Sequence, residues 1–221
     1  MKKEYIFLQF ALVFLFFILP PLLTNQAQVL RPVGTLTWML AVEVALVVLL
    51  EFEHRKFFKE KSAQSKTQLF IHCLSVSTLT LGLLMLAFAL SQFLSIMFPS
   101  LVHQNTEIAF PQTLWQWISV LLVFLVSAVY EEVLYRQFLP FVALLIAGKV
   151  TFFQFLAELV AVLVFAFSHR YLGLVAVINA FVCGIILRWC YIKTRSFVPG
   201  AIAHFLYNII VFSFWILSVN T

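Results

Sequence analysis

The stretch that decides the fold is "LWQWISVLLVFLVSAVYEEVLYR", residues 114–136. Its first 17 residues carry no charge, and Glu131, Glu132 and Arg136 follow directly after them. A membrane span needs about 20 mostly apolar residues, so the uncharged part predicts a transmembrane helix. Ionisable groups in or next to such a helix are costly in lipid and usually face a cavity or a partner. This stretch therefore predicts both a membrane protein and a site of interest within it.

The composition of the whole chain supports the same class. The 221 residues are 63% hydrophobic and 10% charged, whereas soluble domains carry about 25% charged residues. We therefore expect an all-α, polytopic transmembrane bundle, without the alternating polarity of a membrane barrel. About seven transmembrane helices are predicted, near residues 5–23, 36–52, 69–98, 114–130, 152–168, 171–191 and 197–217. The first run follows Lys2 and Lys3 as in a signal peptide, but its poor cleavage site favours a retained helix.

The basic residues predict an orientation. With the N-terminus in the cytoplasm, the inner segments hold eleven Lys and Arg residues and the outer ones hold only Arg31 and Arg170. The net charge of +5 thus indicates cytoplasmic loops rather than a nucleic-acid surface, and a bacterial inner membrane is the expected location. We divide the chain into residues 1–113, with N-terminal helices and a basic cytoplasmic loop near 53–67, and a core of residues 114–217.

Two further features concern single residues in apolar runs. Cys73, Cys183 and Cys190 form no CxxC pair, and we expect small buried side chains rather than a disulfide framework. Glu43, inside the second predicted span, is a lone carboxylate with no obvious partner in the sequence.

Three polar clusters remain once the loops are set aside. In the first, Glu132 and Arg136 are four residues apart and can pair on one helix face, whereas Glu131 points about 100° away and is left without that partner. The second ends "FAFSH" at His169, and the third, "HFLYN", places His204 and Asn208 four apart. Singly, each cluster has an ordinary structural explanation. Together they offer the base and the hydrogen-bond donors that hydrolysis requires.

The fifth predicted helix raises a question of depth. It begins on the inner side and ends at His169, so a straight helix would carry this residue roughly 25 Å across the membrane. The three clusters meet only if this helix tilts, if it enters near Glu158, or if water reaches a deep cavity. Glu158 favours entry at its own position, since a carboxylate prefers the interface.

The order of the motifs resembles the CPBP intramembrane endopeptidases, which include type II CAAX prenyl endopeptidases and bacterial Abi proteins. The family pattern EExxxR, FxxxH and HxxxN is matched by "EEVLYR" (131–136), "FAFSH" (165–169) and "HFLYN" (204–208). The resemblance covers residues 114–211. It implies an intramembrane peptide hydrolase whose partners are the bilayer and a membrane-associated peptide or protein, without nucleic acid.

The resemblance also implies a role for each motif residue. Glu131 would be the general base that activates water together with His169. His204 and Asn208 would polarise the scissile carbonyl and hold the oxyanion. The supporting residues would be Glu132, Arg136 and Phe165.

Alternatives to this mechanism remain open. Glu131, His169 and His204 could instead hold zinc, although the chain has no HExxH motif, and we favour the mechanism without a cofactor. A non-proteolytic immunity or scaffold protein would keep the motifs for packing. A transporter or proton relay, with a pathway through Glu43, Glu131, Glu158 and the histidines, ranks below both.

Overall fold

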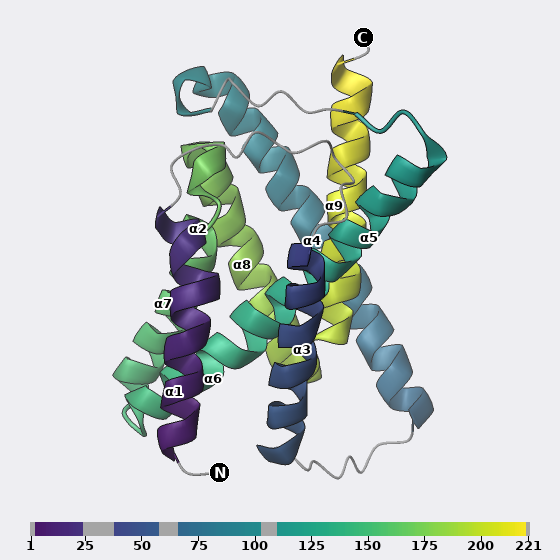
Figure 1. Ribbon diagram of the computed structural model, residues 1–221. Helices are drawn as coiled ribbons and strands as arrows, with labels where there is room; N and C mark the ends of the chain where they lie inside the picture. The colour runs from purple at the N-terminus through teal and green to yellow at the C-terminus, as the bar shows by residue number, and fades with distance from the viewer. Residues whose placement is uncertain (1–2, 24–37, 58–65, 103–109, 220–221) are drawn as a thin grey trace.

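The computed structural model describes residues 3–23, 38–57, 66–102 and 110–219 (Figure 1). These residues contain no strand, only an isolated bridge between Val102 and Gly173, so the all-α prediction is confirmed. Arg31 and the middle of the predicted basic loop, residues 58–65, lie outside the described residues.

Two of the helices contain a π-helical turn. The first runs through α1 (Lys3–Val13), η1 (Phe14–Ile18) and α2 (Leu19–Leu23). The other runs through α5 (Leu114–Glu131), η3 (Glu132–Phe138) and α6 (Leu139–Ala147). The remaining long helices are α3 (Trp38–Phe57), α4 (Lys66–Met97), α7 (Thr151–Phe167), α8 (Leu174–Thr194) and α9 (Val198–Val219). Two short 3₁₀ turns complete the described structure, η2 (Pro99–Leu101) and η4 (Arg170–Leu172).

Five of these helices are long and apolar enough to cross a membrane. They correspond to five of the seven predicted spans, and the fourth span continues through η3 to Ala147 because the chain stays helical past the charged motif. Among the other two, α7 is apolar but has only 17 residues. α3 carries Glu43, Glu51 and Glu53, which interrupt its apolar run.

Local sequence signals set the ends of the helices around the motif. Thr113 caps α5: its hydroxyl accepts a hydrogen bond from the Gln116 amide, and the Gln116 side chain accepts one from the Thr113 amide. Gly173, with φ of 97°, allows the tight turn from η4 into α8. The connection after His169 is therefore short, in line with the predicted spans 152–168 and 171–191.

The bundle brings distant parts of the chain together around η3. α4 packs along α8 and α9, α5 crosses α3 and α9, and α7 packs between α6 and α8 (Figure 1). Gly184 of α8 lies so close to α7 that an added Cβ would be 3.1 Å from Val162 and 3.2 Å from Phe165. Because α7 is held this closely, the segment that ends at His169 is fixed against the centre of the bundle.

The single residues noted in the sequence have distinct environments. All three cysteines are free; Cys183 and Cys190 are buried as predicted, whereas Cys73 is only half-buried. Glu43 is also half-buried, and its Oε2 makes no hydrogen bond among the described residues. The structure therefore adds no hydrogen-bonding partner for that oxygen.

Candidate active site

The first motif lies on a widened helical turn. Glu131 is the last residue of α5, and Glu132 to Phe138 form η3, where the Leu139 amide bonds back five residues to the Leu134 carbonyl. A π-helical turn takes more residues than an α-helical one, so the side chains around it are displaced from their α-helical directions. Here the consecutive residues Glu131 and Glu132 both come within reach of α9.

Glu132 and Arg136 form a buried ion pair. Nε of Arg136 lies 3.6 Å from Oε1 of Glu132, and the two side chains are 1% and 0% exposed. The Arg136 guanidinium also lies over the Phe165 ring, with Cζ 3.9 Å from the ring centroid, which is a cation–π contact. The sequence spacing predicted the ion pair, whereas the contact with Phe165 joins the first motif to the second.

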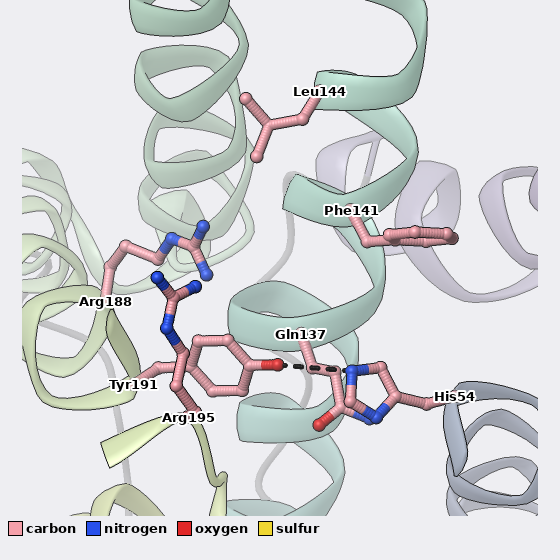
Figure 2. Close-up of a pocket in the computed structure, with 7 residues that line it drawn as sticks. All are labelled: His54, Gln137, Phe141, Leu144, Arg188, Tyr191 and Arg195. Carbon is pink, nitrogen blue, oxygen red and sulfur yellow. Dashed lines mark hydrogen bonds between the residues drawn. The ribbon is translucent and has the colours of Figure 1, made fainter. Parts of the chain in front are cut away.

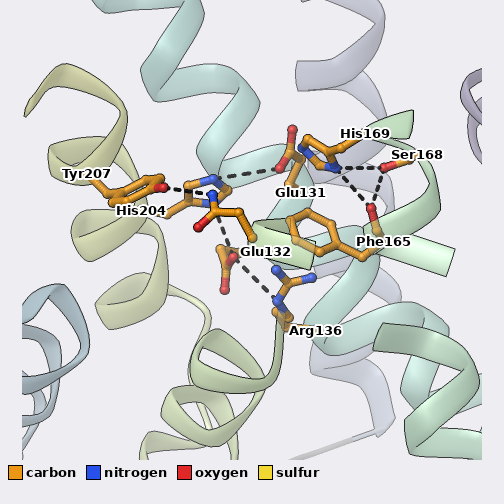
Figure 3. Close-up of polar contacts among 9 residues, drawn as sticks. Glu131, Glu132, Arg136, Phe165, Ser168, His169, His204 and Tyr207 are labelled. Atoms are coloured by element: carbon orange, nitrogen blue, oxygen red, sulfur yellow. Dashed lines mark hydrogen bonds and ion pairs between the residues drawn. The ribbon is translucent and has the colours of Figure 1, made fainter. Parts of the chain in front are cut away.

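His204 of α9 lies against both glutamates (Figure 3). Its Nδ1 is 3.3 Å from Oε1 of Glu132, and its Nε2 is 3.7 Å from Oε2 of Glu131. Helix geometry alone left Glu131 without a partner. In the structure it has the His204 imidazole beside it. Its side chain is 23% exposed and that of Glu132 is 0% exposed, although the Glu131 Oε2 that faces His204 is itself buried. Glu131 is therefore the more accessible carboxylate of the pair.

His169 has a fixed orientation at the end of α7. Its Nδ1 lies 2.9 Å from the Phe165 carbonyl oxygen and 3.2 Å from Oγ of Ser168, which itself donates to that carbonyl. A carbonyl only accepts, so Nδ1 carries a proton, and in the neutral ring Nε2 then keeps its lone pair. No hydrogen bond or ion pair joins His169 to Glu131 among the described residues.

Phe165 connects His169 with the first motif through its ring. The Phe165 ring lies 4.8 Å from the His169 ring and 5.3 Å from the Tyr135 ring, both in edge-on arrangements, and the Arg136 guanidinium covers it. The three motifs thus form one contact network, with His204 touching the glutamates directly and His169 joined to them through an aromatic side chain.

Asn208 stands apart from this network. It is half-buried, and within the described part of the chain its side chain makes no hydrogen bond. A neighbouring pair was missed by the sequence analysis: Nδ2 of Asn179 donates to the Tyr207 hydroxyl at 3.0 Å. Asn179 is the one amide within the apolar sequence of α8, a signal that could have pointed to it.

Glu158 has a partner that the sequence did not suggest. The expectation was a carboxylate at the membrane interface, yet Glu158 accepts two hydrogen bonds from Arg188, at 2.6 Å and 2.5 Å. Arg188 also donates from Nη1 to the Arg136 carbonyl oxygen. This ion pair ties α7 to α8 and both of them to η3.

A metal site is the alternative chemistry for these residues. Among the described residues, no three His, Cys, Asp or Glu side chains form a group that could hold a metal ion. Glu131 and His204 lie close together, but the third ligand of the zinc hypothesis, His169, is held by its own helix end.

Comparison with known proteins places the candidate site in a family domain. Residues 113–210 match the family model "Type II CAAX prenyl endopeptidase Rce1-like", so this part of the chain is a domain of the CPBP family. No curated protein and no solved structure matches the chain. The matched residues include all three motifs.

Proposed function

Because residues 113–210 form a domain of the CPBP family, whose model is named for a prenyl endopeptidase, we propose that this chain is an intramembrane endopeptidase. The observation that carries the proposal is the contact of His204 with both Glu131 and Glu132 inside an apolar bundle. An apolar bundle has no ordinary need for two adjacent carboxylates and an imidazole, whereas peptide hydrolysis needs a base and an oxyanion donor. The substrate is a peptide bond in a membrane-associated protein or peptide.

Glu131 is the proposed general base. Of the two glutamates, Glu132 is fully buried and engaged by Arg136, whereas Glu131 is partly exposed and only loosely held, 3.7 Å from Nε2 of His204. A water bound to its carboxylate would lose a proton to that carboxylate as it attacks the scissile carbonyl carbon. The protonated Glu131 then returns that proton to the leaving amine as the C–N bond breaks, which balances the step.

His169 would orient the same water. Its Nδ1 is occupied by the Phe165 carbonyl, so the free lone pair on Nε2 is available to accept a hydrogen bond from the water. The packing of its ring against Phe165 restricts the direction of that lone pair. This agrees with the role that the sequence resemblance implies.

His204 would stabilise the oxyanion of the tetrahedral intermediate. To donate from Nε2 while Nδ1 donates to Glu132, both ring nitrogens must carry a proton, and the ring is then an imidazolium. The buried Glu132 carboxylate would balance that charge, which gives the second glutamate of the motif a reason to be ionised. Asn208 is the second proposed donor, and its side chain, which makes no hydrogen bond among the described residues, would turn toward the substrate.

The test is peptide cleavage by the purified protein reconstituted in lipid. A fluorogenic peptide library, in prenylated and unprenylated form, would be incubated with the wild type, with Glu131→Gln, and with Glu60→Gln as an isosteric control in the basic loop. Removing the base is expected to lower kcat by about 10²–10⁴-fold. The Glu60→Gln variant is expected to cleave at the wild-type rate.

Two further arms separate the alternatives. Full activity in a strong chelator supports the glutamate mechanism, and loss that zinc restores supports the metal-dependent form. If Glu131→Gln folds and cleaves like the wild type, the assignment of Glu131 is wrong. If the wild type cleaves nothing and Glu131→Gln preserves the cellular phenotype of the gene, the non-proteolytic role is favoured instead.

A further inference from the structure

A cavity lies apart from the candidate catalytic residues, near the ends of α3 and α8. It has a volume of about 330 Å³, and none of the proposed catalytic residues lines it. Five polar side chains and two apolar ones form its wall (Figure 2): His54, Gln137, Arg188, Tyr191 and Arg195, with Phe141 and Leu144.

Two guanidinium groups meet in this pocket (Figure 2). Arg188 is held in place by three hydrogen bonds, two to Glu158 and one to the Arg136 carbonyl. A guanidinium has five N–H groups, so Arg188 retains two for another acceptor. The Arg195 backbone amide bonds to the Tyr191 carbonyl, but its guanidinium makes no hydrogen bond or ion pair among the described residues, so all five of its side-chain N–H groups are available.

The backbone fixes where Arg195 stands. It follows the last residue of α8, its φ is 53°, and it is the one described non-glycine residue in the left-handed region. A side chain other than Gly or Asn is uncommon there. This conformation ends α8 and places the exposed Arg195 at the pocket wall, beside the fixed guanidinium of Arg188.

The acidic groups near the pocket are already engaged. Glu158 accepts two bonds from Arg188, and Glu51 accepts a bond from the Gln137 amide at 3.0 Å. His54 and Tyr191 face each other at 3.4 Å on the same wall. Two adjacent guanidinium groups repel each other unless an anion lies between them, and the N–H groups that remain suit an acceptor with several oxygens.

We propose that this pocket binds a phosphate group, carried by an anionic phospholipid. Arginine binds phosphate oxygens with two parallel N–H donors, which favours phosphate chemistry. The apolar side chains of Phe141 and Leu144 on the same wall favour a phosphate that carries acyl chains over the free ion. Basic residues at the cytoplasmic end of membrane helices are the usual contacts of such lipids.

The pocket is linked to the η3 turn of the candidate active site through Gln137, which belongs to that turn, and through Arg188. Arg188 lines the pocket on one side and donates to the Arg136 carbonyl on the other. A lipid phosphate bound there would stabilise the η3 turn that carries Glu132 and Arg136. The proposal does not require the chain to be a peptidase, since lipid binding is measured without any substrate.

The test compares lipid retention in nanodiscs. The protein would be placed in phosphatidylcholine alone, in phosphatidylcholine mixed with phosphatidylglycerol, and in phosphatidylcholine with added inorganic phosphate. Native mass spectrometry then counts the retained lipids. The variant Arg195→Gln removes the free guanidinium, and Lys193→Gln removes an equal charge that does not line the pocket.

The wild type is expected to retain phosphatidylglycerol over phosphatidylcholine, and Arg195→Gln is expected to weaken this preference about tenfold. Lys193→Gln is expected to keep it. Equal losses in both variants would mean a general effect of surface charge and would overturn the proposal, as would a wild type without any preference. If inorganic phosphate displaces the retained lipid, the pocket recognises the phosphate group. If phosphate binds but the wild type shows no preference between the two lipids, the proposal that the phosphate belongs to a phospholipid is wrong.

Discussion

At the scale of single residues, the site depends on how closely α9 approaches the first motif. Gly200 in the first turn of α9 lies against the carboxylate of Glu132, where a Cβ would be 2.7 Å from Oε2. No real Cβ contact is that short, so any larger residue must displace Glu132 or the helix. The absence of a side chain at Gly200 is therefore part of how His204 reaches both glutamates.

Replacing Gly200 is thus expected to disturb the site. Gly200→Ala should destabilise the fold by about 1–3 kcal/mol through overpacking and should reduce activity along with it. Gly82→Ala is the matched control, because an added Cβ there meets nothing within 4 Å, and it should stabilise α4 by about 0.5–1 kcal/mol. Thermal unfolding in detergent measures both. Equal stability of the two variants would show that the space between Gly200 and Glu132 admits a Cβ without strain.

The residue scale also shows what the sequence could predict. The pairing of Glu132 with Arg136 is local, and a spacing of four residues was enough to predict it. The contact of His204 with Glu131 depends on a widened turn, for which the sequence carries no simple signal. The bond between Asn179 and Tyr207 joins residues 28 positions apart on two helices, and spacing rules do not reach that far.

At the scale of helices, the link between α7 and α8 supports the catalytic turn. Arg188 is 11% exposed and bonds to Glu158 as well as to the Arg136 carbonyl. Removing the Glu158 carboxylate leaves Arg188 without its ion pair, whereas removing the Arg188 guanidinium leaves both Glu158 and the Arg136 carbonyl without that donor. This link was not predicted, because Glu158 and Arg188 are 30 positions apart and each has an ordinary explanation at a membrane interface.

Substituting Arg188 should therefore destabilise the fold more than substituting Glu158. Glu158→Gln keeps a hydrogen-bond acceptor near Arg188 and, at a side chain that is 29% exposed, should cost about 1 kcal/mol. Arg188→Met also removes the donor to the Arg136 carbonyl and leaves Glu158 unpaired, and should cost about 3 kcal/mol. Unfolding midpoints in one detergent compare them. A larger loss for Glu158→Gln would contradict the support of η3 by Arg188.

At the scale of the whole molecule, the surface requires a lipid environment. Large apolar side chains are exposed on several helices, among them Leu86 (67%), Ile96 (76%) and Leu114 (77%). A soluble protein rarely leaves so many large apolar side chains exposed on its helices. With five helices long and apolar enough to span, the fold class follows from composition, whereas α3 and α7 differ from the predicted spans because of charge and length.

The orientation in the membrane is the whole-molecule prediction. The start of α1 and the end of α9 lie at opposite ends of the bundle (Figure 1), and the distribution of Lys and Arg favours a cytoplasmic N-terminus. Alkaline phosphatase fused after Thr221 should be active, and the same enzyme fused after Lys149 should be inactive. If the Lys149 fusion is active and the Thr221 fusion is inactive at equal abundance, the orientation is the reverse of the predicted one.

The free thiols have a practical consequence. Cys190 is fully buried and Cys183 is 5% exposed, both on α8 in the interior of the bundle, and only Cys73 is half-buried. A maleimide dye should therefore label Cys73 in the folded protein and label the other two only after α8 has separated from its neighbours. The slow phase of labelling at Cys183 and Cys190 thus reports the rate at which the native bundle opens. No engineered reporter is needed for this measurement.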